Sequence, residues 1–466
     1  MRTLIVAELK GAWSSWFAVL ISFVATSFAL VLALLVIGSM EATIATGIVP
    51  ALNVPALQFV PGWNLALAIV GTLSVIGAVT GLVVQARRGA LARLSLAGAT
   101  PSQVSRILLG QLVIVSVLGA VIGIILAISL QPAALAMLLE DRDVDASGAV
   151  VRTDPMLIAI GGLGFVLVAL LAGLRQARVA ASIAPVEALR TVPGAQTSSR
   201  RIGRWVIAAL LAVVIVAMGV LGAVIAPELG EDGGDTVLQV SVAALLLSGV
   251  MLALAAPLTI GLLTRGWTAL IPTRSASWVL ARASIIAKGE RLARTVTPIA
   301  LTIGLLVGLG TIVASISVLL ASMGHPGLSN ATLLSTLTLI ALVLIISISG
   351  GVSVVLMMSR QREAELALAG VVGATPSQQV LVTVFEGVII TVTATLLGLA
   401  MTAIGMIVFV TGLASLGLQA PFVIPWGDFA AVTGICAVVV IAATTLPALP
   451  SLRRPARQVV AQLSGE

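Results

Sequence analysis

The chain has 466 residues, of which 59% are hydrophobic and 9% are charged, whereas soluble domains carry roughly 25% charged residues. This composition leaves too little polar surface for a soluble globule of that size and indicates an integral membrane protein. The single cysteine, Cys436, excludes an internal disulfide, and one histidine with no tyrosine leaves little for a histidine-ligated metal site or for histidine acid–base catalysis.

Ten apolar runs are long enough to cross a membrane. A transmembrane helix needs about 20 predominantly apolar residues to span a hydrocarbon core of roughly 30 Å. The runs are rich in Ala, Val, Leu and Gly and lack the alternation of a membrane β-barrel. We therefore predict an all-α polytopic membrane protein with ten transmembrane helices, near residues 13–40, 62–86, 107–137, 155–174, 205–226, 237–264, 297–322, 332–358, 380–410 and 428–448.

The basic residues predict which way the spans point. With the N-terminus in the cytoplasm, every Lys and Arg except Arg142 and Arg152 falls on the inner side, and acidic residues gather in the outer segments 140–154 and 228–235. Because this follows the positive-inside rule, we predict a multi-pass protein of the bacterial cytoplasmic membrane with both termini in the cytoplasm. This topology, with attraction to membrane lipid, accounts for the net charge of +7, so no nucleic-acid partner is expected.

The strongest motif is a direct internal repeat. The hexamer GATPSQ at residues 98–103 recurs unchanged at residues 373–378. Both copies fall in predicted cytoplasmic loops, after the second and eighth spans, so the two repeats share one orientation. We therefore divide the chain into a first four-span unit (1–190), a two-span insert (191–275) and a second four-span unit (276–466).

The repeated hexamer has the chemistry of one helix ending and another beginning. Its threonine suits an N-cap, its proline the first helical position, and its glutamine the partner position of a capping box. Its glycine suits the position just after a helix, where φ is positive. We therefore expect short cytoplasmic helices near 87–97 and 360–372, each followed by a tight turn. The turn and cap residues are Gly98, Thr100, Pro101 and Gln103 in the first copy and Gly373, Thr375, Pro376 and Gln378 in the second.

Three segments carry a resemblance to a known family. They are RRGALARLSLAGATPSQ (87–103), RQREAELALAGVVGATPSQ (360–378) and RVAASIAPVEALR (178–190). These segments resemble FtsX-like permeases, the membrane subunits of the MacB, LolCE and BceB class of ABC transporters. The resemblance covers both four-span units, and the ten-span layout is most similar to the BceB branch.

The resemblance implies an ATP-driven transporter whose ATPase is a separate polypeptide. The sequence contains no G-x-x-x-x-G-K-[ST] motif, so this chain is expected to be no enzyme and to bind no cofactor, with ATP and Mg²⁺ held by the partner. In the family, the helix between the second and third spans of a unit docks on a nucleotide-binding subunit, so two copies of a P-loop ABC ATPase per chain are expected. The docking residues carried over are Arg87, Arg88, Leu91 and Ala92 in the first copy and Arg362, Glu363, Glu365, Leu366 and Ala367 in the second.

The predicted outer loops are short where related permeases carry a large external domain. The loops at 41–61 and 322–330 are too short to fold alone, which favours an amphiphile taken from the bilayer, such as a peptide, drug or lipid, over a soluble cargo. Two alternatives stay open at this point. One is a non-transporting, FtsX-like regulator that passes ATPase strokes to a cell-envelope enzyme, with an external lipoprotein or peptide as partner. The other is an ion-coupled secondary transporter.

Two polar residues at equivalent repeat positions lie inside predicted spans. Glu386 is the only acid placed in a span, and its counterpart is Gln111. An ionisable side chain in a span is costly and usually faces protein or water. We therefore interpret both residues as helix–helix contacts, with a role in coupling or in proton transfer as less favoured alternatives.

One acidic segment resembles the start of a calcium-binding loop. Asp141, Asp143 and Asp145 have the spacing of the first three ligands, but Ala146 and Arg152 break the pattern that follows. We interpret this segment as a solvated acidic loop, and no metal site is predicted.

Overall fold

All regular secondary structure in the computed structural model is helical, and no strand occurs among the residues that it describes. The predicted all-α fold class is therefore confirmed. The described residues are 13–51, 54–86, 96, 98–140, 144–181, 198–272, 275–287, 290–323, 341–346, 348–353, 356–357, 369–370, 372–419 and 421–445.

Nine helices within these ranges are long and apolar enough to cross a membrane, which confirms a polytopic membrane protein. They fall on nine of the ten predicted spans. The remaining span, predicted near 332–358, is described in part, as the shorter apolar helix Ala341–Ser353. The count of ten therefore stays a prediction.

The contacts divide the chain into two compact units, and the first comprises Met1–Gly194 with Thr338–Arg360. In this unit α2 packs against α3, α5 and α6. The rings of Phe23 and Phe165 meet edge to face in its core, with centroids 5.5 Å apart. The helices of the first unit are α2 (Trp13–Ala45), α3 (Val54–Ala86), α5 (Pro101–Glu140) and α6 (Pro155–Ala181), together with helix Ala341–Ser353.

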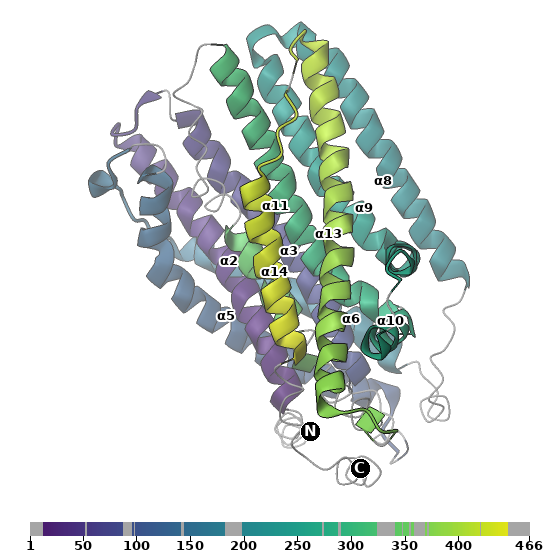
Figure 1. The fold of residues 1–466 in the computed structure, drawn as a ribbon. Helices are drawn as coiled ribbons and strands as arrows, with labels where there is room; N and C mark the ends of the chain where they lie inside the picture. Colours follow the sequence, from purple (N-terminus) through teal and green to yellow (C-terminus); the bar gives the residue numbers. More distant parts are fainter. Residues whose placement is uncertain are drawn as a thin grey trace. The chain divides into compact units, whose positions relative to one another are not determined.

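The second unit comprises Ala195–Leu337 and Gln361–Glu466. Its helix α13 packs against all the other labelled helices of the unit. Figure 1 shows α10 almost end-on while α13 runs lengthwise, so α10 lies across α13. The helices of the second unit are α8 (Ser198–Ile225), α9 (Gly233–Ala269), α10 (Ala276–Ala287), α11 (Glu290–Ser322), α13 (Pro376–Ser415) and α14 (Trp426–Thr445).

The internal repeat is visible in the helices themselves. α5 and α13 have the same length, 40 residues, and each begins at the proline of its hexamer. Each also packs closely on the helix that opens its repeat, α2 for α5 and α11 for α13. The division of the sequence at 190 and 275 stays a prediction, and the contacts place residues 338–360 with the first unit.

The two close helix pairs use glycines at equivalent positions. A Cβ atom on Gly123 of α5 would lie 2.7 Å from the backbone nitrogen of Phe28, and one on Gly398 of α13 would lie 2.9 Å from that of Gly304. No side chain fits at either distance, so these backbones touch directly. Small residues allow such approach in membranes, where association depends on van der Waals packing because the surrounding lipid is also apolar.

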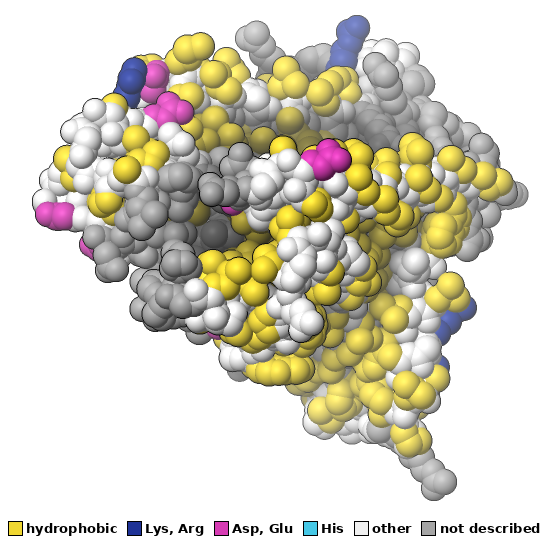
Figure 2. All heavy atoms as spheres, turned by 90° about the horizontal axis from the view of Figure 1, so that it is seen from above, with side chains coloured by type: hydrophobic (Ala, Val, Ile, Leu, Met, Phe, Trp, Pro, Cys, Tyr) yellow, Lys and Arg dark blue, Asp and Glu magenta, His cyan; other side chains and the backbone are white. Residues whose placement is uncertain are grey.

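The surface is apolar over much of its described area. Figure 2 shows hydrophobic side chains over much of the view, with scattered charged ones. α6 and α8 are mostly exposed, and their outward residues are large aliphatic side chains such as Leu163, Leu167 and Val213. Helices that are apolar on their exposed faces are suited to contact with lipid.

Candidate functional site

The first copy of the repeated turn joins a positive-φ glycine to a capped helix. Gly98 has φ of +93°, and α5 begins three residues later at Pro101. The backbone N–H of Thr100 donates to Gln103 Oε1 at 2.9 Å, and the Gln103 N–H approaches Thr100 Oγ1 at 3.4 Å. The side chains of Thr100 and Ser102 also share a hydrogen bond of 3.0 Å. These contacts satisfy N–H groups that would otherwise lack partners at the start of α5.

The second copy has the same N-terminal cap. Thr375 has extended backbone angles and is the N-cap of α13, with Pro376 as the first helical residue. Its N–H donates to Gln378 Oε1 at 3.0 Å, and the Gln378 N–H donates back to Thr375 Oγ1 at 3.3 Å. Thr375 and Ser377 share a side-chain hydrogen bond of 3.1 Å. The two hexamers therefore form the same set of contacts.

The second turn also shows how the preceding helical segment ends. Gly373 has φ of +106°, its N–H donates to Gly370 O at 3.1 Å, and the Ala374 N–H donates to Ala369 O at 3.0 Å. This pair of bonds is a Schellman motif, which closes the C-terminus of a helix at a left-handed residue. Helix end and helix start are thus separated by two residues.

Apolar side chains just before the turns are exposed. Val372 is 89% exposed and Leu96 is 55% exposed. The nine predicted docking residues precede them and lie outside the described residues, so their contacts stay predictions. These nine are Arg87, Arg88, Leu91, Ala92, Arg362, Glu363, Glu365, Leu366 and Ala367.

The two predicted intramembrane polar residues are both buried in helices that follow the turns. Gln111 is buried in α5, and Glu386 is 3% exposed in α13. The Ser284 hydroxyl of α10 donates to Glu386 Oε1 at 2.6 Å. Glu386 thus joins two helices. This contact is a hydrogen bond between two helices, of the kind that joins helices in membranes.

An aromatic cluster lies beside Glu386 and was not anticipated from the sequence. The Trp278 ring of α10 meets Phe385 of α13 edge to face at 5.6 Å and Trp267 of α9 at 6.3 Å. Trp267 Nε1 donates to Thr393 Oγ1 at 3.0 Å, and Arg282 Nε donates to Thr268 Oγ1 at 2.9 Å. Together these contacts fasten α10 to both α9 and α13.

At the end of the first unit opposite the turn at residues 98–103, the loop 144–154 is hydrogen-bonded to α2 and α5. The buried amide of Gln131 donates to Ser39 Oγ at 2.7 Å and to Arg152 O at 3.0 Å, so α5, α2 and the loop meet at one side chain. Asp145 accepts from the N–H and the hydroxyl of Ser147, and these bonds lower the pKa of its carboxyl. Asp141 and Asp143 lie outside the described residues, and among the described ones no three potential ligands gather at a metal site.

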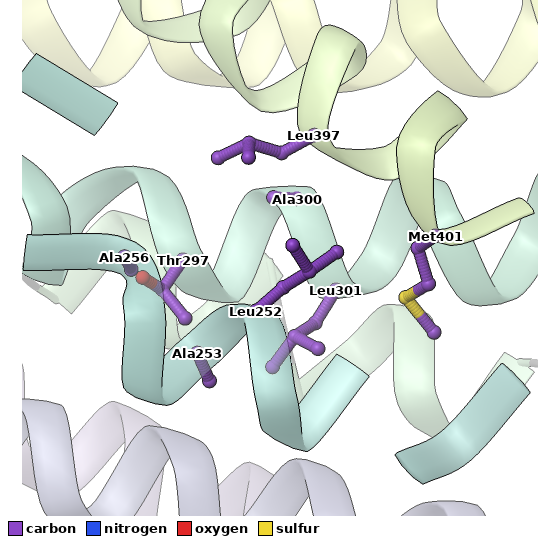
Figure 3. A pocket seen from close by; sticks show the side chains of 8 residues that line it. All are labelled: Leu252, Ala253, Ala256, Thr297, Ala300, Leu301, Leu397 and Met401. Atoms are coloured by element: carbon purple, nitrogen blue, oxygen red, sulfur yellow. The ribbon is translucent and has the colours of Figure 1, made fainter. Parts of the chain in front are cut away.

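A small apolar cavity lies among α9, α11 and α13 (Figure 3). Its volume is about 10 Å³, which is at the lower limit for a single water molecule. The hydroxyl of Thr297, its one polar side chain, is already bonded to Ala293 O. The cavity therefore has no room for a cargo molecule in this conformation. It is lined by Leu252, Ala253, Ala256, Thr297, Ala300, Leu301, Leu397 and Met401.

Comparison with known families gives a match to both repeats. The family model described as FtsX-like permease C-terminal matches residues 62–185 and 337–456, which together make up more than half of the chain. Each matched region contains one copy of the hexamer, whereas the predicted insert lies between them. No curated protein sequence matches the chain at a significant level.

Proposed function

Because the chain belongs to the FtsX-like permease family, we propose that it is the membrane subunit of an ABC exporter and that a separate polypeptide hydrolyses the ATP. The observation that carries this proposal is the repeated turn. Two identical hexamers begin two equally long helices with the same cap. A surface turn needs no such duplication, whereas two docking positions for two copies of one ATPase do.

The turns are suited to passing a movement into the membrane. In each copy the docking segment leads within a few residues to α5 or α13, through a junction closed by hydrogen bonds. A junction with its backbone groups paired has little freedom to absorb a displacement. The exposed side chains of Leu96 and Val372 add apolar surface that a docked subunit would cover.

The charges support an orientation with the turns in the cytoplasm of a bacterial cell. Arginines occur near the same helix ends as the turns, and acids occur near the opposite ends, as the positive-inside rule requires. Described arginines at the turn ends include Arg106, Arg204, Arg265 and Arg282, whereas Arg152 lies at the acidic end, where the acids include Glu41, Glu140, Glu228, Asp235 and Asp428.

The proposed cargo is an amphiphile, such as a peptide, drug or lipid, that reaches the transporter from the bilayer. The connections between α2 and α3 (residues 46–53) and between α13 and α14 (residues 416–425) have too few residues to form a folded domain that would receive a soluble cargo. Broad apolar faces on α6 and α8 contact lipid and give a membrane-dissolved molecule direct access.

The test is a tagged purification of the permease in mild detergent, with mass spectrometry of the proteins that co-purify and an ATPase assay on the complex. We expect two ATPase chains per permease, and ATP hydrolysis that falls when Leu91→Asp and Leu366→Asp are combined. Leu270→Asp is the matched control, because Leu270 is also a leucine, is 81% exposed and lies outside both docking segments.

Two results would contradict this proposal. A permease that binds no ATPase, and transports only when a proton gradient is present, would favour a secondary transporter. An ATP-hydrolysing complex that moves no amphiphile but controls an external cell-wall enzyme would favour the regulator.

A further inference from the structure

The short helix α10 lies across the long helices of the second unit instead of running beside them (Figure 1). Its Trp278 ring contacts Phe385, near the start of the span predicted for α13. Its Arg282 contacts Thr268, just beyond the end of the span predicted for α9. Both contacts indicate that α10 lies at one boundary of the hydrocarbon core, where tryptophan side chains are enriched.

The guanidinium group of Arg282 is held in one orientation by α9. Its Nε donates to Thr268 Oγ1 at 2.9 Å, and the buried Thr268 hydroxyl donates in turn to Thr264 O at 2.5 Å. Arg282 is half-buried, and no described residue forms an ion pair or hydrogen bond with its two Nη atoms. The N–H groups of both Nη atoms are therefore available to an acceptor from outside the chain.

The surface beside this guanidinium is apolar and outward-facing. Leu262 of α9 is 70% exposed, and Val279 and Leu280 of α10 are 54% and 51% exposed. At a membrane boundary such side chains contact lipid. A positive charge in these surroundings is costly unless an opposite charge pairs with it. Arg265, which is exposed one helical turn before Thr268, adds a second positive charge.

We propose that α9 and α10 form a binding site for one anionic phospholipid, with its phosphate on Arg282 and its acyl chains along Leu262 and Val279. A guanidinium group can bind two phosphate oxygens through parallel hydrogen bonds. The second charge, on Arg265, favours a lipid with net negative charge over a zwitterionic one. No ATPase takes part in this binding, so the inference goes beyond the proposed function and does not depend on it.

Native mass spectrometry of the delipidated full chain in a non-ionic detergent tests the site, with dioleoyl phosphatidylglycerol as the added lipid. Arg282→Gln should weaken the tightest binding step about tenfold or more, because hydrogen bonds to a charged group are lost. Arg106→Gln is the matched control, because it also removes one positive charge, from an exposed arginine of α5. It should change the affinity by less than about twofold. Equal effects of the two substitutions would indicate general charge attraction and would overturn the inference.

A second variant tests whether the orientation of the guanidinium matters. Thr268→Val keeps every charge and the shape of the side chain but removes the acceptor for Arg282 Nε. It should weaken lipid binding by about threefold to tenfold, and unchanged binding would overturn the inference. This variant decides the matter alone if Arg282→Gln does not fold.

The identity of the ligand is tested with two further compounds. Dioleoylglycerol, which has the same acyl chains but no phosphate, should not displace the bound phosphatidylglycerol. Inorganic phosphate at the same concentration should not displace it either, because it has no chains to contact Leu262 and Val279. Displacement by inorganic phosphate would indicate a simple anion site, and displacement by dioleoylglycerol would indicate an apolar groove. Either result would overturn the inference.

Discussion

Gly98 and Gly373 have the same unusual backbone conformation at equivalent points of the two repeats, with φ of +93° and +106°. In each copy the glycine lies two residues before the threonine that caps the next helix. L-residues other than glycine rarely adopt positive φ, since the Cβ atom meets the backbone. The turn therefore depends on glycine at this position in both copies.

The first prediction concerns Gly373→Ala. We expect a loss of about 1–2 kcal/mol in the free energy of unfolding, because alanine is strained at positive φ. Thermal unfolding in detergent measures it. Gly261→Ala is the control, because Gly261 is helical and has open space around its Cβ position; there alanine should stabilise the helix. A similar change at both positions would contradict a strained turn.

The second prediction concerns the cap of α13. Thr375→Ala removes the hydroxyl that accepts from Gln378 N–H, and it should cost about 1 kcal/mol. Hydrogen exchange of the first turn of α13 should become faster. Thr375→Ser should behave like the unsubstituted chain, because serine keeps the hydroxyl. Thr411→Ala, at an exposed threonine that bonds its own helix, should leave that exchange unchanged.

The third prediction tests whether Glu386 only joins two helices or also has a role in function. Glu386→Gln keeps an oxygen acceptor for Ser284, so complex assembly and ATP hydrolysis should persist if the residue only joins α10 to α13. Glu386→Leu removes that acceptor and should lower stability by about 1–3 kcal/mol. If Glu386→Gln assembles normally yet hydrolyses no ATP in response to cargo, the helix-joining interpretation is wrong.

The fourth prediction concerns the aromatic cluster. Trp278→Ala leaves a cavity between Trp267 and Phe385, and it should cost about 3–5 kcal/mol. Thermal unfolding of the purified protein measures this loss. Trp426→Ala is the matched control, because Trp426 is two-thirds exposed. A loss at Trp278 no larger than at Trp426 would mean that α10 is not held by its tryptophan.

Local features of the fold follow from the sequence because they depend on neighbouring residues. Length and hydropathy are enough to predict the spans, and nine of the predicted spans coincide with long helices in the structure. The contacts of Thr100 with Gln103 and of Thr375 with Gln378 join residues three apart. A motif of that length contains all the partners that it requires.

Long-range contacts could not be predicted in the same way. Ser284 and Glu386 are 102 positions apart, and Ser22 and Ser353 are 331 apart. In a soluble protein an apolar stripe marks the buried face of a helix, but a membrane helix is apolar toward both protein and lipid. The sequence therefore does not show whether Trp278 faces protein or lipid. It also gives no reason to place residues 341–353 beside α2.

The length of α13 has a geometric consequence for any movement that begins at its cap. At 1.5 Å per residue, its 40 residues extend about 60 Å, roughly twice the thickness of the hydrocarbon core. No proline interrupts the helix after its first residue, whereas α5 contains Pro132. A stiff helix of this length acts as a lever arm: tilting its base by about 10° would swing its far end by about 10 Å. A small displacement of the first turn of α13 would thus become a larger one at Ser415.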